Sequence, residues 1–217
     1  MNTAIAFDMD GVIIDSQPLH YEIDMEVLRT CGYTPTLETV TPYTGVSNPD
    51  RWPEYKKTLA LAQTVDRLIE LQTEIMIDIF NRAHLAPIGG IVELLEFLQA
   101  KNIPCAVASS SSHELINLVL EKCQIGQYFT HLVSGEDVKN GKPAPDIYLK
   151  AAKVFGLPPE KCIAIEDSPM GILAAKNAGF TCIGYVNPNT HGQDFTHADY
   201  VVHHYDECHA IISACAV

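Results

Sequence analysis

The stretch FDMDGVIIDS, residues 7–16, places two aspartates at the end of a short apolar run and follows them directly with a glycine. Side chains alternate along an extended strand, so Asp8 and Asp10 face the same way and can share one pocket. Gly11 allows the chain to turn where a side chain would clash. The stretch alone therefore predicts either a functional pair of carboxylates or an ordinary turn in which an aspartate caps backbone amides.

Around this stretch, short apolar runs alternate with longer segments of helical period. This pattern is typical of a parallel sheet wrapped by helices. Strands are expected at 4–8, 104–109, 131–134, 162–167, 181–186 and 200–202. Helices are expected at 91–100, 115–123 and 147–155. We therefore predict an α/β fold with a Rossmann-like, doubly wound parallel sheet.

The interval 16–86 interrupts the alternation. It has the periodicity of helices, including the amphipathic run 65–80, but no convincing strand, and several prolines divide it. We predict an all-helical insertion at 16–86 and an α/β core formed by 1–15 and 87–217, both of ordinary domain size.

The composition is that of a globular protein and restricts its partners. Hydrophobic residues make up 47% of the 217 residues, and 27 acidic against 14 basic residues give a net charge of −13. Nucleic acids and anionic membranes need a basic surface, so neither is an expected partner. No apolar stretch approaches the ~18 residues of a membrane span, and the N-terminus has no basic leader. Seven cysteines without a CxxC pair indicate free thiols and a cytoplasmic location.

A run of serines follows the strand expected at 104–109. Ser111 and Glu114 have the spacing of a capping box, which predicts a helix N-terminus with Ser111 as its cap. Free amides there favour an anion, which Ser109 and Ser110 could also contact. A serine nucleophile is less expected, because the sequence has no GxSxG motif.

Lys142 lies in the segment GEDVKNGKPAPDIY, residues 135–148. The segment is not a phosphate-binding Walker loop, because Pro143 stands where that loop has Ser or Thr. Held between prolines, Lys142 could supply a fixed cation to a phosphate, although a solvated surface lysine fits the segment equally well.

Two adjacent acids, Glu166 and Asp167, end the strand expected at 162–167, and Ser168 and Pro169 suit the start of a helix. Acids that share a cleft with Asp8 and its neighbours would repel one another unless a divalent cation neutralised them. Oxygen-only ligands are what Mg²⁺ prefers. The alternative is that these acids only complement a helix dipole.

Taken in order along one core, these residues resemble the motifs of the haloacid dehalogenase-like (HAD) phosphotransferase superfamily. The positions that carry the resemblance are Asp8, Asp10, Ser109, Lys142, Glu166 and Asp167. The insertion after the first motif resembles the cap of the subgroup that contains β-phosphoglucomutase and many small sugar phosphatases.

The resemblance implies a magnesium-dependent phosphatase acting on a small phosphorylated metabolite. It implies that Asp8 is the nucleophile, that Asp10 is the general acid and base, and that an aspartyl-phosphate forms. The implied magnesium site comprises the Asp8 carboxylate, the Asp10 backbone carbonyl and Asp167, with Glu166 in support. The implied phosphate site comprises Ser109, Ser110 and Lys142. A monomer or a weak homodimer is expected.

A sugar phosphomutase is the nearest alternative. His20 stands where β-phosphoglucomutase has a cap histidine, but Asn48 stands where that enzyme has the arginine that holds a second phosphate. The substitution favours hydrolysis. A non-catalytic protein that binds a phosphorylated ligand also remains open. Candidate substrate contacts in the insertion are Ser16, His20, Asn48, Arg51, Trp52 and Lys56, although Trp52 could equally belong to internal packing.

Overall fold

The computed structural model describes residues 3–44, 48–190 and 192–215. Its centre is a six-stranded parallel sheet in the order β3-β2-β1-β4-β5-β6. The strands are β1 (Ala4–Phe7), β2 (Cys105–Ser109), β3 (His131–Ser134), β4 (Cys162–Glu166), β5 (Thr181–Tyr185) and β6 (Tyr200–Val202). Each expected strand agrees with these bounds to within one residue at either end, and the predicted α/β fold is confirmed.

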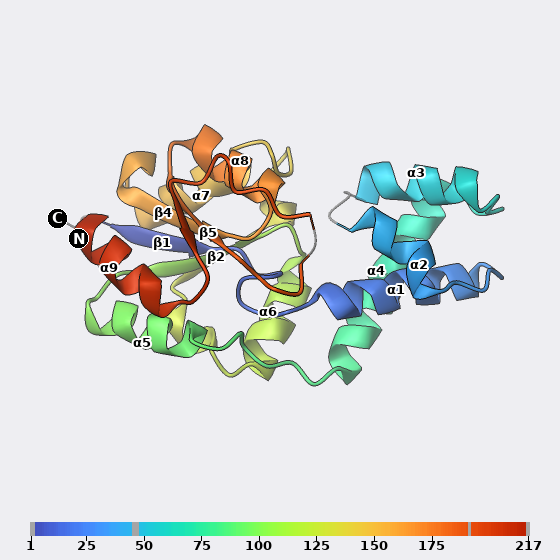
Figure 1. Ribbon diagram of the computed structural model, residues 1–217, viewed down its shortest axis with the longest axis horizontal. Coiled ribbons are helices and arrows are strands. Elements are labelled where there is room, and N and C mark those ends of the chain that lie inside the picture. The colour runs from blue at the N-terminus through green and yellow to red at the C-terminus, as the bar shows by residue number, and fades with distance from the viewer. Residues whose placement is uncertain (1–2, 45–47, 191, 216–217) are drawn as a thin grey trace. The chain divides into compact units, whose positions relative to one another are not determined.

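Helices cover both faces of the sheet (Figure 1). One face carries α7 (Asp146–Phe155) and α8 (Pro169–Ala178), and the other carries α5 (Ile91–Ala100), α6 (His113–Lys122) and α9 (Asp206–Cys215). Short 3-10 helices occur at η2 (Gly126–Tyr128), η3 (Gly135–Asp137) and η4 (Pro159–Lys161). The sheet is therefore doubly wound, and the strand order changes direction at β1. In such sheets ligands bind beyond the carboxyl ends of the strands at that point.

The two faces of β1 bury different side chains. Ala4 and Ala6 join the core cluster that packs under α7 and α8, whereas Ile5 and Phe7 point to the opposite face. All four are fully buried. A strand buried on both faces reads as a continuous apolar run, which is why residues 4–7 were recognisable.

Helix ends mostly follow the sequence signals. Gly156 and Gly179 end α7 and α8 in the left-handed conformation, and Ser168 caps α8 by accepting from the Gly171 amide at 3.1 Å. The expected cap of α6 is wrong. Ser112, not Ser111, is the N-cap, and its hydroxyl accepts from the Leu115 amide at 3.3 Å.

The physical reason for this difference lies in the loop before α6. The Ser111 amide donates to Ser109 Oγ at 3.1 Å, and the Ser111 carbonyl accepts from Ser134 Oγ at 2.6 Å. These bonds hold Ser111 in the turn that precedes the helix. The His113 amide, at the start of α6, is satisfied by Glu136 at 2.9 Å rather than by a cap within the helix.

The chain divides into two compact units, Ser16–His84 and the remainder, Met1–Asp15 with Leu85–Val217. The smaller unit consists of α1 (Gln17–Thr30), α2 (Leu37–Val40), η1 (Thr41–Tyr43), α3 (Asn48–Thr58) and α4 (Val65–Arg82), with no strand among its described residues. It ends two residues before the expected boundary at 86. All seven cysteines are free. Within the described residues, none of the helices has the length and apolar character needed to span a membrane.

Candidate active site

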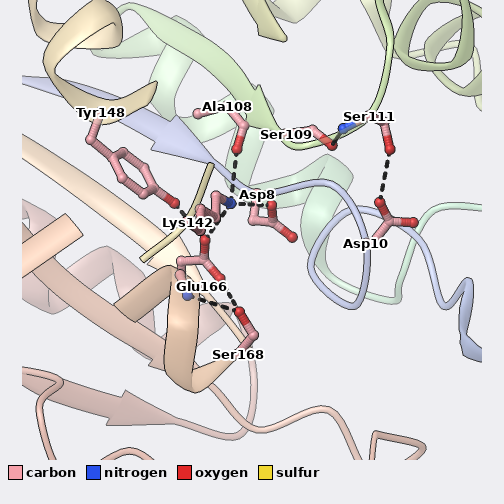
Figure 2. A network of polar contacts seen from close by, with 10 residues as sticks. Asp8, Asp10, Ala108, Ser109, Ser111, Lys142, Tyr148, Glu166 and Ser168 are labelled. Atoms are coloured by element: carbon pink, nitrogen blue, oxygen red, sulfur yellow. Dashed lines mark hydrogen bonds and ion pairs between the residues drawn. The ribbon is translucent and has the colours of Figure 1, made fainter. Parts of the chain in front are cut away.

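Lys142 lies at the centre of the polar network in Figure 2. Its ammonium donates to Asp8 Oδ1 at 2.6 Å, to Glu166 Oε1 at 2.6 Å and to the Ala108 carbonyl at 3.1 Å. These acceptors match the three donors of a lysine ammonium. Burial alone would lower the pKa of Lys142, but the Asp8 and Glu166 carboxylates outweigh burial and raise the pKa above its ordinary value. Lys142 is a buried, fixed cation rather than a solvated surface lysine.

Glu166 is fully buried at the end of β4. Besides Lys142, its carboxylate accepts from the Tyr148 hydroxyl at 2.7 Å and from the Ser168 hydroxyl at 3.2 Å. A Cβ at Gly171, in the first turn of α8, would lie 1.9 Å from Glu166 Oε1. Only a glycine there leaves room for the carboxylate, which is held by donors from the Lys142 loop, from α7 and from the α8 cap.

Asp8, Glu166 and Asp167 form a buried acidic cluster, each offering a carboxylate oxygen within 4.8 Å of the others. Burial raises the pKa of Asp8 well above its usual value; Lys142 offsets only part of this, and Glu166 adds to it. Burial and the Glu166 charge raise the pKa of Asp167 to about 7. Crowded carboxylates repel one another, and an all-oxygen set suits Mg²⁺. The residues present therefore fit a divalent cation.

Asp10 and the serine loop lie next to this cluster (Figure 2). The Ser111 hydroxyl donates to Asp10 Oδ2 at 3.4 Å, so Ser111 contacts a candidate catalytic acid instead of capping α6. Ser109 is almost fully buried at the end of β2, and its hydroxyl accepts from the Ser111 amide. Ser110 is exposed. The carboxyl ends of β1 and β2 thus bring the first acid pair and the serines together.

Asp167 is held between the turn after β1 and the segment after β5. Gly11 has φ +79°, and a Cβ there would lie 2.0 Å from Asp167 Oδ2. The Thr190 hydroxyl donates to the same oxygen at 3.1 Å, and Gln193 donates to the Asp167 backbone carbonyl at 3.1 Å. Gly11 therefore serves both the turn and the close approach of this acid.

The loop that carries Lys142 is braced from both sides. Asn140 donates from its backbone and its side chain to Asp146 Oδ1, at 3.3 and 3.0 Å. Asn177, on α8, donates to the Pro143 carbonyl at 3.2 Å. These bonds fix the backbone on either side of Lys142, so its ammonium is positioned before any ligand arrives.

Two candidate substrate contacts in the helical unit belong to its interior. Trp52 is fully buried, and its indole donates to Gln72 Oε1 at 2.8 Å, which favours the packing alternative over a contact with substrate. Arg51 forms an ion pair with Asp24 at 3.3 Å, and its side chain is only 10% exposed. A buried tryptophan finds a partner for its N–H, and a buried arginine is paired, which explains both positions.

The remaining candidate substrate contacts in this unit differ in their exposure and in their partners. Ser16 is 1% exposed at the start of α1, and the half-buried ring of His20 meets Phe80 edge-on at 6.2 Å. The Lys56 ammonium donates to the carbonyls of Leu61 and Gln63 at 2.9 and 2.6 Å, so Lys56 secures the end of α3. The side chain of Asn48 lies outside the described part of the chain.

Sequence reasoning missed Tyr148 and Thr190. Tyr148 falls on the apolar stripe of α7 and is indistinguishable from an ordinary core residue. Thr190 follows β5 in a polar loop without a recognisable pattern. Gly171 is a related signal, because a glycine within a helix is unfavourable and implies a close approach, here by Glu166, the acceptor of the Tyr148 hydroxyl.

Comparisons with known proteins show which family the chain belongs to. The model of the haloacid dehalogenase-like hydrolase family matches residues 5–185. A phosphorylated carbohydrates phosphatase from Thermotoga maritima is 33% identical over 176 residues, 81% of each chain. The structure of CbbY from Rhodobacter sphaeroides in complex with phosphate has a TM-score of 0.79 and 26% identity, covering 95% of this chain and 96% of that one. β-Phosphoglucomutase from Clostridium difficile has a TM-score of 0.78 and 25% identity, covering 100% and 97%. The chain therefore belongs to the haloacid dehalogenase-like hydrolase family.

Proposed function

We propose that this protein is a magnesium-dependent phosphatase that hydrolyses a small phosphomonoester, with sugar phosphates as the substrate class. The observation that carries the proposal is the position of Asp8. Its carboxylate lies against the buried Lys142 ammonium and within the acidic cluster of Glu166 and Asp167. A carboxylate oriented by a fixed cation and placed at a cation site can act as a nucleophile toward phosphorus.

In the first step, an oxygen of Asp8 attacks phosphorus and the bond from phosphorus to the substrate oxygen breaks. The phosphoryl group is then carried on Asp8 as an acyl phosphate. Asp10 donates its proton to the departing oxygen, which leaves as an alcohol. The Lys142 bond to Asp8 Oδ1 restricts rotation of the carboxylate, so that its two oxygens can take different roles.

In the second step, water attacks phosphorus and gives a proton to the Asp10 carboxylate. The bond from phosphorus to Asp8 breaks, inorganic phosphate leaves, and both aspartates return to their starting states. The Asp8 carboxylate, Asp167 and the Asp10 backbone carbonyl, with Glu166 in support, would hold Mg²⁺, whose charge would offset that of the phosphoryl oxygens. Ser109 and Ser110 would hold the same oxygens, and the charge of the Lys142 ammonium, whose three donors are used by Asp8, Glu166 and the Ala108 carbonyl, would stabilise them through space.

The names of the relatives support the proposed substrate class. The Thermotoga relative is named for phosphorylated carbohydrates, and the CbbY structure holds phosphate. We assign the choice of substrate to the unit Ser16–His84, with His20 and Asn48 as its remaining candidate contacts, since Ser16 is nearly as buried as Trp52.

Mutase activity is the second candidate because of the similarity to β-phosphoglucomutase. A mutase must hold a second phosphate, and a bidentate arginine suits that task. Arg51 is committed to an ion pair with Asp24 and is mostly buried. That pairing favours hydrolysis.

A panel of phosphorylated metabolites, scored for both free phosphate and isomerised sugar phosphate, tests the proposal. We expect phosphate release that requires Mg²⁺ and is lost in Asp8→Asn. Asp78→Asn is the matched control, because Asp78 is exposed on α4 and pairs only with Arg82 among the interactions described. Full activity in Asp8→Asn or in chelator would contradict the mechanism. Isomerised product would favour the mutase, and binding without turnover would favour a non-catalytic protein.

A further inference from the structure

Residues 187–190 and 192–193, which follow β5, are here called the β5 loop; His191 lies outside the described residues and is not part of this definition. The β5 loop begins with Asn187, which is 2% exposed. The Asn187 side-chain oxygen accepts from the Asn189 backbone amide at 2.9 Å, and the Asn187 backbone carbonyl accepts from the Thr190 backbone amide at 3.2 Å. The loop is therefore folded on itself, with the Thr190 hydroxyl in a defined place.

The β5 loop contacts Asp167 twice. The Thr190 hydroxyl donates to Asp167 Oδ2 at 3.1 Å, and Gln193 donates to the Asp167 backbone carbonyl at 3.1 Å. Asp167 is only 4% exposed, so little water is available to replace these partners. Both the carboxylate and the backbone of this acid are held by one loop.

The same loop also holds the turn that carries the first acid pair. Asn187 Nδ2 donates to the Gly11 carbonyl at 3.1 Å, next to Asp10. Asn189 Nδ2 donates to Asp15 Oδ2 at 2.6 Å, at the last residue before the helical unit. The turn after β1 and the acid after β4 are thus tied to a single segment.

We propose that the β5 loop is the positioning element of the cation site and that Thr190 is the residue that sets the orientation of the Asp167 carboxylate. The inference rests on the proposed function, because it assumes that Asp167 binds Mg²⁺. A hydroxyl that donates to Oδ2 limits rotation about the Cβ–Cγ bond and so fixes where Oδ1 points. Groups that orient a metal ligand in this way typically account for 10- to 100-fold in affinity.

The test compares Mg²⁺ affinity, measured by titration calorimetry on the full chain, in three variants. Thr190→Val keeps the shape of the side chain and removes the hydroxyl. Thr190→Ser keeps the hydroxyl and removes the methyl group. Thr196→Val is the matched control, because Thr196 is exposed and its hydroxyl donates to Asp194, outside the acidic cluster.

We expect the Mg²⁺ dissociation constant to be about tenfold larger in Thr190→Val, close to the parental value in Thr190→Ser, and unchanged in Thr196→Val. The melting temperature without Mg²⁺ separates positioning from a merely structural role, since positioning changes affinity more than apo stability. Parental Mg²⁺ affinity in Thr190→Val, with binding intact in the unmodified protein, overturns this inference alone. A protein that binds no Mg²⁺ at all overturns the proposed function as well.

Discussion

The Glu166 carboxylate is fully buried, yet it accepts hydrogen bonds from the Lys142 ammonium and from the hydroxyls of Tyr148 and Ser168. A buried charge is tolerated only when it is paired and hydrogen-bonded, and here the partners come from three separate segments. Tyr148 and Ser168 therefore help to fix the position of Glu166. Glu166 in turn holds Lys142, and Lys142 contacts Asp8.

At the residue scale, the sequence predicts the acids but not their partners. Asp8, Asp10 and Asp167 were identifiable because strand ends place acids in a sheet's ligand-binding crevice. The Tyr148 hydroxyl could not be assigned, because its bond to Glu166 depends on how α7 packs on the sheet. The sequence could not decide the role of Trp52, because an aromatic residue beside polar residues looks the same in a binding surface and in a helix interior.

Tyr148→Phe should lower the free energy of unfolding by about 1.5–3 kcal/mol, the usual worth of a hydrogen bond to a charged group. The matched control is Tyr205→Phe, whose hydroxyl donates to the neutral Val12 carbonyl and whose loss should cost about 0.5–1.5 kcal/mol. Urea denaturation of both variants measures the difference. A larger loss in Tyr205→Phe would mean that the Glu166 bond is not the stronger one.

At the scale of elements, the starts of α6 and α8 shape the site. Ser112 and Ser168 cap these helices, and α8 begins beside Glu166 and Asp167. The caps of α6 and α8 could be predicted to within one residue. The prediction of Ser111 in place of Ser112 at α6 has a specific cause. Bonds from Ser109 and Ser134 to the Ser111 backbone are long-range features that no local motif reveals.

Ser112→Ala should reduce the free energy of unfolding by about 1 kcal/mol, because it removes the N-cap of α6. Ser111→Ala, the adjacent control, should change the stability by less than about 0.5 kcal/mol, since among the described residues its hydroxyl makes only a long bond to Asp10. Denaturant midpoints of the two variants test the assignment. A greater loss in Ser111→Ala would restore the cap expected from sequence.

Gly171→Ala should destabilise the protein by about 1–3 kcal/mol, although alanine normally strengthens a helix. The new Cβ would meet the Glu166 carboxylate at 1.9–2.1 Å. Gly89→Ala is the control, because a Cβ there meets nothing within 4 Å. Thermal denaturation compares them, and a stabilised Gly171→Ala protein would show that Glu166 has space to move.

At the scale of the whole molecule, the strand order explains why distant residues meet. β1 lies between β2 and β4, so the carboxyl ends of these three strands bring together Asp8, Ser109 and Glu166. The alternation of strands and helices predicted a doubly wound parallel sheet, but it did not predict the order of the strands. The contacts of the β5 loop could not be predicted, because Gly11, Asp15 and Asp167 are distant in the sequence and come near the loop only in the folded protein.

Mg²⁺ should stabilise the whole chain, because the folded protein gathers the acidic cluster and the unfolded chain does not. At a hundredfold excess over the dissociation constant, the gain in unfolding free energy should be about 2.7 kcal/mol. Asp167→Asn should lose most of this gain, and the Asp78→Asn control should keep it. A gain of equal size in Asp167→Asn would place the cation elsewhere.

The central claim is that Asp8 attacks phosphorus within a site completed by Lys142 and the acidic cluster. Rapid acid quenching of the Mg²⁺-loaded protein with a radiolabelled sugar phosphate, followed by digestion, measures which residue carries the phosphoryl group. We predict label on the peptide that contains Asp8, and none in Asp8→Asn or in chelator. Label on another residue, or unchanged phosphate release by Asp8→Asn, would contradict the account.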